Sequence, residues 1–312
     1  MDTGNETFLT EFILTGFPQN LKTRIVMFVL FLLLYTLTIL GNCFIIFTVV
    51  VSPQLHNPMY FFLLNLSFLD ICYSSNSLPK ILLDMFSKKR RISVIGCLAQ
   101  MNLGLFLGET ECILLAVMAY DRYIAICFPL YYTIIMNKKV CRNVTILMWS
   151  ISFITSTLPI ALRPLTFCRR NRLDHFACEI LALLGLACGD LSFYKTTIFF
   201  MSLFTLLAPF IFITGSYFCI ILAILKIRST DRRTKTFSTC ASHLTVVLMF
   251  YGASMTMYLG QTKTFSYQLK YISLMYGVIT PALNPLIYSL RNNDVKEAFQ
   301  KIMDNHYVTR ST

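Results

Sequence analysis

The stretch Ile25–Val51, IVMFVLFLLLYTLTILGNCFIIFTVVV, contains no Asp, Glu, Lys or Arg. A helix needs about 20 mostly apolar residues to cross the hydrocarbon core of a bilayer. The stretch is long enough for such a helix and too long for the apolar core of a cleaved signal peptide. Composition agrees, because 56% of the chain is hydrophobic and only 13% is charged, about half the charged fraction of soluble domains. The sequence therefore predicts a membrane protein.

Further apolar runs follow, joined by short segments except for the stretch 163–195. The predicted spans are 25–51, 58–80, 94–127, 140–162, 196–226, 236–260 and 269–290. No repeat, linker or low-complexity segment indicates a second domain. We expect one all-α domain over 1–312: an N-terminal segment 1–24, a seven-helix bundle 25–290 and a tail 291–312.

Seven spans put the two chain ends on opposite sides of the membrane. The 27 Lys and Arg residues do not decide which side is which, because 13 fall on one side and 14 on the other,. Asn5–Thr7 is a glycosylation sequon, usable only in the lumen. One side also holds an even set of cysteines, typical of disulfides in an oxidising compartment: Cys97, Cys168, Cys178 and Cys188,. We expect an extracellular N-terminus, glycosylation at Asn5 and two disulfides, with three pairings open.

Ionisable residues inside spans are costly and mark candidate sites. Asp70 lies in the second span and Glu111 in the third. At 100° per residue, Glu111 shares one helix face with Cys97 and Arg122, so we expect it to face the bundle interior. Asp70 and Glu111 then form either a pair that binds a cation or shares a proton, or a structural hydrogen-bonded pair.

Two glycines lie on the same inward face, Gly104 and Gly108. They serve either close helix packing or space for a ligand. Glu109 lies about 100° further round, so we expect it to face a neighbouring helix; the alternative is a counter-ion for an amine ligand. Pro209, Pro281 and Pro285 predict kinks in the fifth and seventh spans.

Several motifs then match one family in order and spacing. They are Pro58–Tyr60 (PMY), Met118–Cys127 (MAYDRYIAIC), Ser216–Tyr217 (SY), Lys235–Leu244 (KTFSTCASHL, with Thr236 for the usual Ala) and Pro281–Asn292 (PALNPLIYSLRN). Over nearly its whole length the chain resembles vertebrate olfactory receptors of the tetrapod-type class, within the rhodopsin-like G-protein-coupled receptor superfamily.

The resemblance implies disulfides Cys97–Cys178 and Cys168–Cys188. It implies that Asp121 holds Arg122 at rest and that Arg122 turns toward Tyr217 on activation. The other residues implied in this switch are Tyr123, Asn284, Pro285 and Tyr288, which relay it from Asp70. The resemblance further implies an amphipathic helix over 292–303 on the membrane lipid, with Val295, Phe299 and Ile302 on its lipid side.

The implied ligand is a small, mostly hydrophobic, volatile odorant, held in the outer half of spans 3, 5, 6 and 7. The expected pocket consists of Gly104, Leu105, Gly108, Met201, Thr205, Tyr251, Ser254, Met255, Tyr258 and Leu274, with Tyr251 at the family's aromatic switch position. The implied partner is the stimulatory heterotrimeric G protein of olfactory neurons, which raises cAMP in their ciliary plasma membrane.

The alternatives are a receptor of this class used outside olfaction, or a channel or transporter; inverted repeats, which would favour a transporter, are not visible. We expect neither an enzyme nor a nucleic-acid partner. His175–Glu179 resembles a proposed metal motif of the family, but Cys178 in a disulfide could not ligate copper or zinc. We therefore expect no cofactor except a candidate sodium ion near Asp70 and Glu111.

Overall fold

The computed structural model describes residues 9–168, 171–260, 269–291 and 293–308. The sequon at Asn5 lies outside the described residues. The helices are α1 (Leu21–Val51), α2 (Pro58–Phe86), α3 (Val94–Cys127), α4 (Tyr132–Ile135), α5 (Lys138–Leu162), α6 (Ile180–Leu184), α7 (Ser192–Ser202), α8 (Ala208–Leu225), α9 (Thr230–Tyr258), α10 (Leu269–Leu274), α11 (Thr280–Arg291) and α12 (Asn293–Val308). The strands are β1 (Glu11–Leu14), β2 (Arg91–Ser93) and β3 (Arg172–Leu173).

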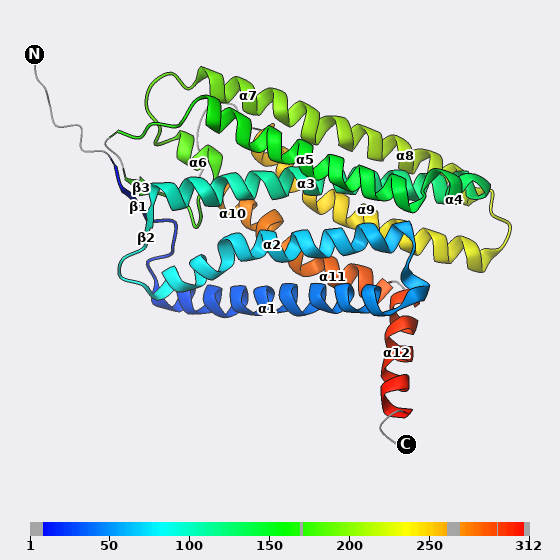
Figure 1. Ribbon diagram of the computed structural model, residues 1–312. Coiled ribbons are helices and arrows are strands. Elements are labelled where there is room, and N and C mark those ends of the chain that lie inside the picture. The colour runs from blue at the N-terminus through cyan, green and yellow to red at the C-terminus, as the bar shows by residue number, and fades with distance from the viewer. Residues whose placement is uncertain (1–8, 169–170, 261–268, 292, 309–312) are drawn as a thin grey trace, which may run out of the picture.

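The predicted seven-helix bundle is confirmed. Its members lie side by side as α1, α2, α3, α5, α7–α8, α9 and α10–α11 (Figure 1). Within the described residues, five of these are long and apolar enough to cross a membrane by themselves: Leu21–Val51, Val94–Cys127, Lys138–Leu162, Ser192–Leu225 and Thr236–Tyr258. The other two are α2, which carries buried polar residues such as Asp70, and the interrupted segment α10–α11.

Several helices extend beyond the predicted spans. α1 begins at Leu21, α2 continues to Phe86 and α9 begins at Thr230, whereas the predicted spans began at 25, ended at 80 and began at 236. The spans were predicted from apolar runs, which end near the edge of the hydrocarbon core, whereas a helix can continue into the polar interface. The added turn of α2 is charged: Lys80 and Asp84 form an ion pair of 2.5 Å, one helical turn apart.

Two members of the bundle contain π-helical turns, Leu203–Leu207 between α7 and α8 and Met275–Ile279 between α10 and α11. Pro209 and Pro281 each follow such a turn by two residues. Proline has no N–H and its ring crowds the carbonyl four residues earlier. The wider turn accommodates that carbonyl, as is common where membrane helices bend.

A small sheet covers one end of the bundle, in the order β2-β1-β3. β1 pairs antiparallel with β2 and parallel with β3. Beyond β1, a Cβ on Gly16 would lie 2.6 Å from the carbonyl carbon of His175, so only glycine permits this approach. The sequence did not predict the sheet, because strands of two to four residues are too short for an alternating pattern to be recognised.

α12 leaves the other end of the bundle across the axis of α1 (Figure 1). It spans Asn293–Val308, five residues beyond the predicted end at 303. The prediction that Val295 faces lipid was wrong, since its side chain is buried in the bundle core. The reason is the position of the first turn, which Tyr60 of α2 holds by donating to Asp294 at 3.0 Å. Further along, Phe299 packs edge-on against Phe44 of α1.

Candidate functional site

Two disulfides stabilise the end of the bundle that carries the sheet. Cys97 at the start of α3 is bonded to Cys178 in the loop before α6, and Cys168 is bonded to Cys188 within the same loop. These are the pairs that the resemblance implied. We call this end of the molecule the disulfide end, and the opposite end, where α3 carries Arg122, the Arg122 end.

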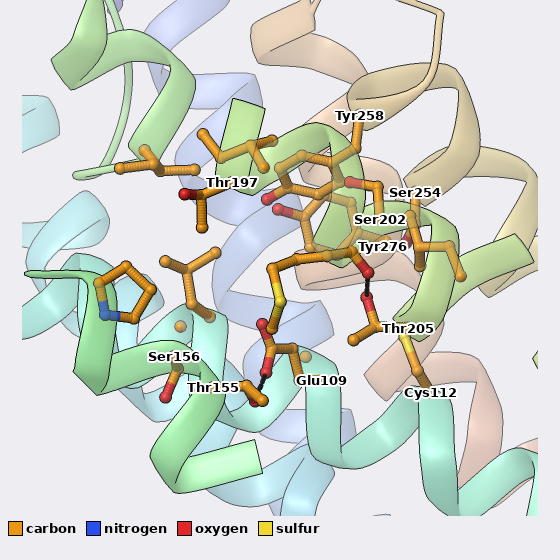
Figure 2. A pocket seen from close by; sticks show the side chains of 18 of the residues that line it. Glu109, Cys112, Thr155, Ser156, Thr197, Ser202, Thr205, Ser254, Tyr258 and Tyr276 are labelled. Atoms are coloured by element: carbon orange, nitrogen blue, oxygen red, sulfur yellow. Dashed lines mark hydrogen bonds between the residues drawn. The ribbon is translucent and has the colours of Figure 1, made fainter. Parts of the chain in front are cut away.

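A cavity of about 100 Å³, the main cavity, lies toward the disulfide end between α3, α5, α7 and α9 (Figure 2). Most of the residues predicted for the pocket lie in its wall: Gly104, Leu105, Gly108, Met201, Thr205, Ser254 and Tyr258. A Cβ on Gly104 or Gly108 would make only ordinary contacts, at 3.5 and 3.7 Å. Close helix packing therefore does not require glycine at either position, and both glycines enlarge the cavity.

The other three predicted pocket residues lie elsewhere. Tyr251 is fully buried and donates to the carbonyl oxygen of Cys112 at 2.8 Å, so it joins α9 to α3 behind the cavity wall. Met255 packs against the hydrophobic core. Leu274 lines a second cavity. Counting along a helix from a motif places a residue at a depth in the bundle, but the side-chain direction depends on the neighbouring helices.

One wall of the main cavity was not predicted at all, because the fourth span was left out of the expected pocket. α5 contributes Thr155, Ser156, Pro159 and Ile160. These residues repeat at helical spacing, but hydroxyl and apolar residues on a membrane helix are equally typical of ordinary packing. No signal in the sequence separates the two.

Glu109 also lies in this wall. Its expected orientation toward a neighbouring helix agrees with the structure, since Thr155 of α5 lies 2.5 Å from its Oε2 atom. The alternative drawn from the sequence, a counter-ion for an amine ligand, requires that this carboxyl border the ligand space, and Glu109 does border the main cavity (Figure 2). The reason is that the cavity extends into the space between α3 and α5, beyond the inward face of α3.

A second cavity of about 70 Å³, the loop cavity, lies under the disulfide-bonded loop and shares Tyr258 and Tyr276 with the main cavity. Glu179 in its wall accepts from the backbone N–H groups of Leu181 and Ala182 at 2.8 and 3.1 Å, and from Tyr258 at 3.2 Å. Burial raises the pKa of Glu179 to about 7, although these hydrogen bonds by themselves lower it.

The side chains of the proposed metal motif are engaged in other bonds. His175 lies 2.8 Å from the carbonyl oxygen of Ala177 and 3.2 Å from Ser273, and burial lowers the pKa of His175 to about 4. Cys178 is in a disulfide and Glu179 caps α6. Within the described ranges, no three His, Cys, Asp or Glu side chains are grouped as metal ligands.

Deeper in the bundle, Asn284 of α11 donates to both carboxylate oxygens of Asp70, at 3.0 and 3.1 Å. Both residues are almost completely buried, as is Glu111, which lies close enough to Asp70 to interact with it electrostatically. The Oε1 atom of Glu111 is buried without a hydrogen-bond partner in the described part of the chain. Among the described residues, the hydrogen bonds to Asp70 thus come from Asn284 and not from Glu111.

At the Arg122 end, Asp121 accepts from Tyr132 of α4 at 2.9 Å. The expected Asp121–Arg122 pair is not among the ion pairs of the described residues. The reason is geometric, because consecutive residues on a helix point about 100° apart and do not face each other. Arg122 instead lines a small space together with Tyr288 and Ser242. Tyr123, next to it, is only half-buried.

Tyr217 and His243 complete this region. Their rings stack at 5.7 Å, and the Tyr217 hydroxyl lies 2.7 Å from Nδ1 of His243. Pro285 packs so closely against α1 that a Cβ on Gly41 would lie 2.8 Å from its ring. We call the buried polar residues of this half, together with the half-buried Tyr132, the polar network: Asp70, Glu111, Asp121, Tyr132, Tyr217, His243, Asn284 and Tyr288.

Known proteins resemble the chain along nearly its whole length. A family model described as olfactory receptor matches residues 31–306. Human olfactory receptor 13H1 is 47% identical over 300 residues, covering 96% of this chain and 97% of that protein. Human olfactory receptor 13C9 is 43% identical over 318 aligned residues, covering 99% and 100%. Members of this family are chemosensory G-protein-coupled membrane receptors and not enzymes. The chain therefore belongs to the olfactory receptor family.

Proposed function

We propose that this receptor binds a small, mostly hydrophobic odorant in the main cavity and activates the stimulatory G protein of olfactory neurons, raising cAMP. The observation that carries the proposal is the position of α3, which lines the cavity from Gly104 to Cys112 and bears Arg122 at its other end. An apolar wall with a few hydroxyl groups suits a volatile ligand held by one or two hydrogen bonds.

Tyr251 supplies the mechanical connection in this proposal. Cys112 lines the cavity, and its carbonyl oxygen accepts from Tyr251 of α9. On the same helix α9, His243 is bonded to Tyr217 of α8 near Arg122. A ligand that binds one arrangement of α3 and α9 more tightly shifts the receptor toward that arrangement, by no more than the difference in affinity.

The test is a cAMP reporter screen of odorants on cells that express the receptor or Arg122→Ala. We expect the variant to reach the cell surface and give no cAMP response, because its guanidinium can no longer serve the G protein. Lys195→Ala is the matched control, since it removes an exposed cation at the disulfide end. A full cAMP response from well-expressed Arg122→Ala would overturn the proposed coupling.

We also propose that the disulfide end faces the extracellular side, with Asn5 glycosylated and the receptor in the ciliary plasma membrane of olfactory neurons. The two disulfides support this orientation, because such bonds form in oxidising compartments,. An N-terminal tag should be accessible to antibody on intact cells, and glycosidase should shift the mobility of the receptor but not of Asn5→Gln. Tag access only after permeabilisation would overturn the orientation.

A sodium ion between Asp70 and Glu111 is a further proposal about the polar network. Two buried carboxyls and the unpartnered Oε1 of Glu111 fit an oxygen-coordinated cation, since an unpaired charge at membrane depth is costly. Asp70→Asn should abolish the dependence of agonist potency on sodium. An identical sodium dependence in receptor and variant would contradict this site.

A further inference from the structure

The main cavity has an acidic group in its wall and no basic one. Glu109 is the carboxylic acid of the lining, and the described lining residues include no Lys, Arg or His. In the described part of the chain the carboxyl is hydrogen-bonded by Thr155 and forms no ion pair. An acid at membrane depth normally faces a partner or a water-filled space, and here it borders space that a ligand can enter.

The hydrogen bonds of Thr155 leave the proton of Glu109 undecided. The Thr155 oxygen lies 2.5 Å from Oε2 of Glu109 and 2.8 Å from the carbonyl oxygen of Ile151. A hydroxyl has a single hydrogen. If it is donated to Glu109, the acid needs no proton and can be ionised; if it is donated to Ile151, the acid keeps its proton and donates to Thr155. The site therefore accommodates both forms of the carboxyl.

The other residues of the cavity wall determine which further chemical groups a fitting ligand must contain. Glu109 and Thr155 lie together on one side of the cavity, and the rings of Tyr258 and Tyr276 lie across from them (Figure 2). Apolar side chains such as Ile160 and Leu206 fill most of the remaining wall. A fitting molecule is small, has a hydrocarbon body and presents a strong donor or a positive charge at one end.

We propose that the main cavity binds small alkyl amines, whose ammonium group pairs with the carboxylate of Glu109. This inference rests on the proposed function only in taking the main cavity as the ligand site. An ammonium has three donors and no acceptor, so one N–H meets Glu109 while neighbouring hydroxyl oxygens, such as that of Thr205, can accept the others.

The proton balance is simple in both cases. An amine that arrives protonated meets the ionised acid and no proton moves. An amine that arrives neutral takes the proton from the Glu109 carboxyl to its nitrogen, which leaves the same ammonium–carboxylate pair. Alkyl ammonium groups resemble the lysine side chain, whose ordinary pKa is about 10.4, so an amine in water at neutral pH reaches the cavity mainly in its protonated form. An alcohol of equal length makes only a neutral hydrogen bond.

The size limit follows from the volume of about 100 Å³. An engineered protein cavity of roughly 150 Å³ accommodates benzene. We therefore expect short amines to fit and long ones to bind only if the wall moves. The decisive comparison keeps the hydrocarbon length constant and exchanges only the polar group.

The experiment measures ligand binding without a G protein. The purified receptor in lipid nanodiscs is titrated with n-alkylamines and with n-alcohols of the same length, and the thermal unfolding midpoint is followed, since a ligand that binds the folded state raises it. Glu109→Gln is compared with Glu109→Asp, which keeps the acid, and with Asp190→Asn, which removes an exposed loop carboxylate.

We expect the best amine to bind at least about tenfold more tightly than its matched alcohol, since charge-assisted hydrogen bonds are roughly twice as strong as neutral ones. Glu109→Gln should lose that preference and leave alcohol binding unchanged, whereas Glu109→Asp and Asp190→Asn should retain it. Equal affinity for amine and alcohol, or no binding of any amine, would overturn the proposal even if Glu109→Gln failed to fold.

The outcome separates this inference from the proposed signalling. Amine-dependent stabilisation together with the absence of a cAMP response to any odorant, amines included, would count against the stimulatory coupling and leave the amine site standing. A cAMP response to alcohols with no preference for amines would refute the amine site and leave the receptor function standing.

Discussion

The main cavity and the polar network differ in how their polar groups are satisfied. In the network, buried side chains bond one another across helices, as Asn284 does with Asp70 and Tyr217 with His243. In the cavity wall, Thr205 donates to the carbonyl of its own helix and leaves its remaining hydrogen-bonding capacity facing open space. The network thus depends on a particular set of residue types. In the cavity wall, hydroxyls such as that of Thr205 can be exchanged without losing a bond between helices, although Thr155 and Tyr258 bond Glu109 and Glu179.

The difference explains why the sequence predicted several network residues within motifs but the cavity wall only in part. A buried polar group that loses its partner costs about 1–3 kcal/mol. Such residues are visible in the sequence, Asn284 within the motif Pro281–Asn292 and Asp70 as an ionisable residue inside an apolar span. Most of the cavity wall is apolar and carries no such constraint. The number of residues that line the main cavity, and the directions of their side chains, depend on the distances between α3, α5 and α9.

The largest effect is expected from removing the Cys97–Cys178 disulfide at the disulfide end. Cys97→Ser removes a bond between residues 81 positions apart, and closing a loop of that length contributes on the order of 4 kcal/mol. We expect the variant to be retained inside the cell, as measured by surface labelling. Cys43→Ser, which changes a free exposed cysteine, should leave surface delivery intact; equal delivery of both variants would contradict the role of the disulfide.

A smaller effect is expected where the polar network requires close helix contact. Gly41→Ala places a methyl group 2.8 Å from the ring of Pro285, and overpacking of this kind costs about 1–3 kcal/mol. The thermal unfolding midpoint of the purified receptor should fall. Gly252→Ala, where a Cβ meets nothing within 4 Å, is the control. An unchanged midpoint for Gly41→Ala would mean that α1 and α11 separate easily.

Tyr251→Phe tests whether this tyrosine contributes to the contact between α9 and α3 or to the wall of the main cavity. The variant loses the bond to the Cys112 carbonyl, which costs about 1 kcal/mol of stability. Because Tyr251 does not line the main cavity, ligand affinity measured by thermal shift should stay the same. Tyr258→Phe, which removes a hydroxyl from the wall of both cavities, should change it. A loss of affinity in Tyr251→Phe alone would reverse this assignment.

A change in pH dependence is expected at the loop cavity. The pKa of Glu179 rises from 4.5 to about 7, so between these values the folded receptor holds a proton that the unfolded chain has released. Its contribution to stability is therefore lost as pH rises through this window. Glu179→Gln stays neutral and should lack this decline in the unfolding midpoint.

His175 in the same loop acts with the opposite sign. Its pKa falls from 6.5 to about 4, so its contribution is present above pH 6.5 and is lost as pH falls through about 4. His175 and Tyr258, which bonds Glu179 from α9, are present in both the receptor and Glu179→Gln. The difference between the two curves of unfolding midpoint against pH therefore reports the titration of Glu179 alone. Parallel midpoint curves for receptor and variant would contradict the raised pKa of Glu179.

The sequence by itself determined the seven apolar segments, the inward face of α3 and the motif residues of the polar network. Apolar runs and helical spacing are local properties, and they survive in any packing that keeps the helices in the membrane. In the structure, Asn284 hydrogen-bonds Asp70. Asp70 is the residue from which the resemblance implied that the activation switch is relayed.

Only the tertiary structure decided the placement of Tyr251 behind the wall, of α5 in the wall, of Val295 in the core and of Glu109 beside the main cavity. Each of these depends on distances between helices that lie far apart in the chain. A side-chain direction on one helix becomes a contact, a cavity wall or a lipid-facing surface only when the neighbouring helix is in place, because helix spacing is set by side chains from both partners.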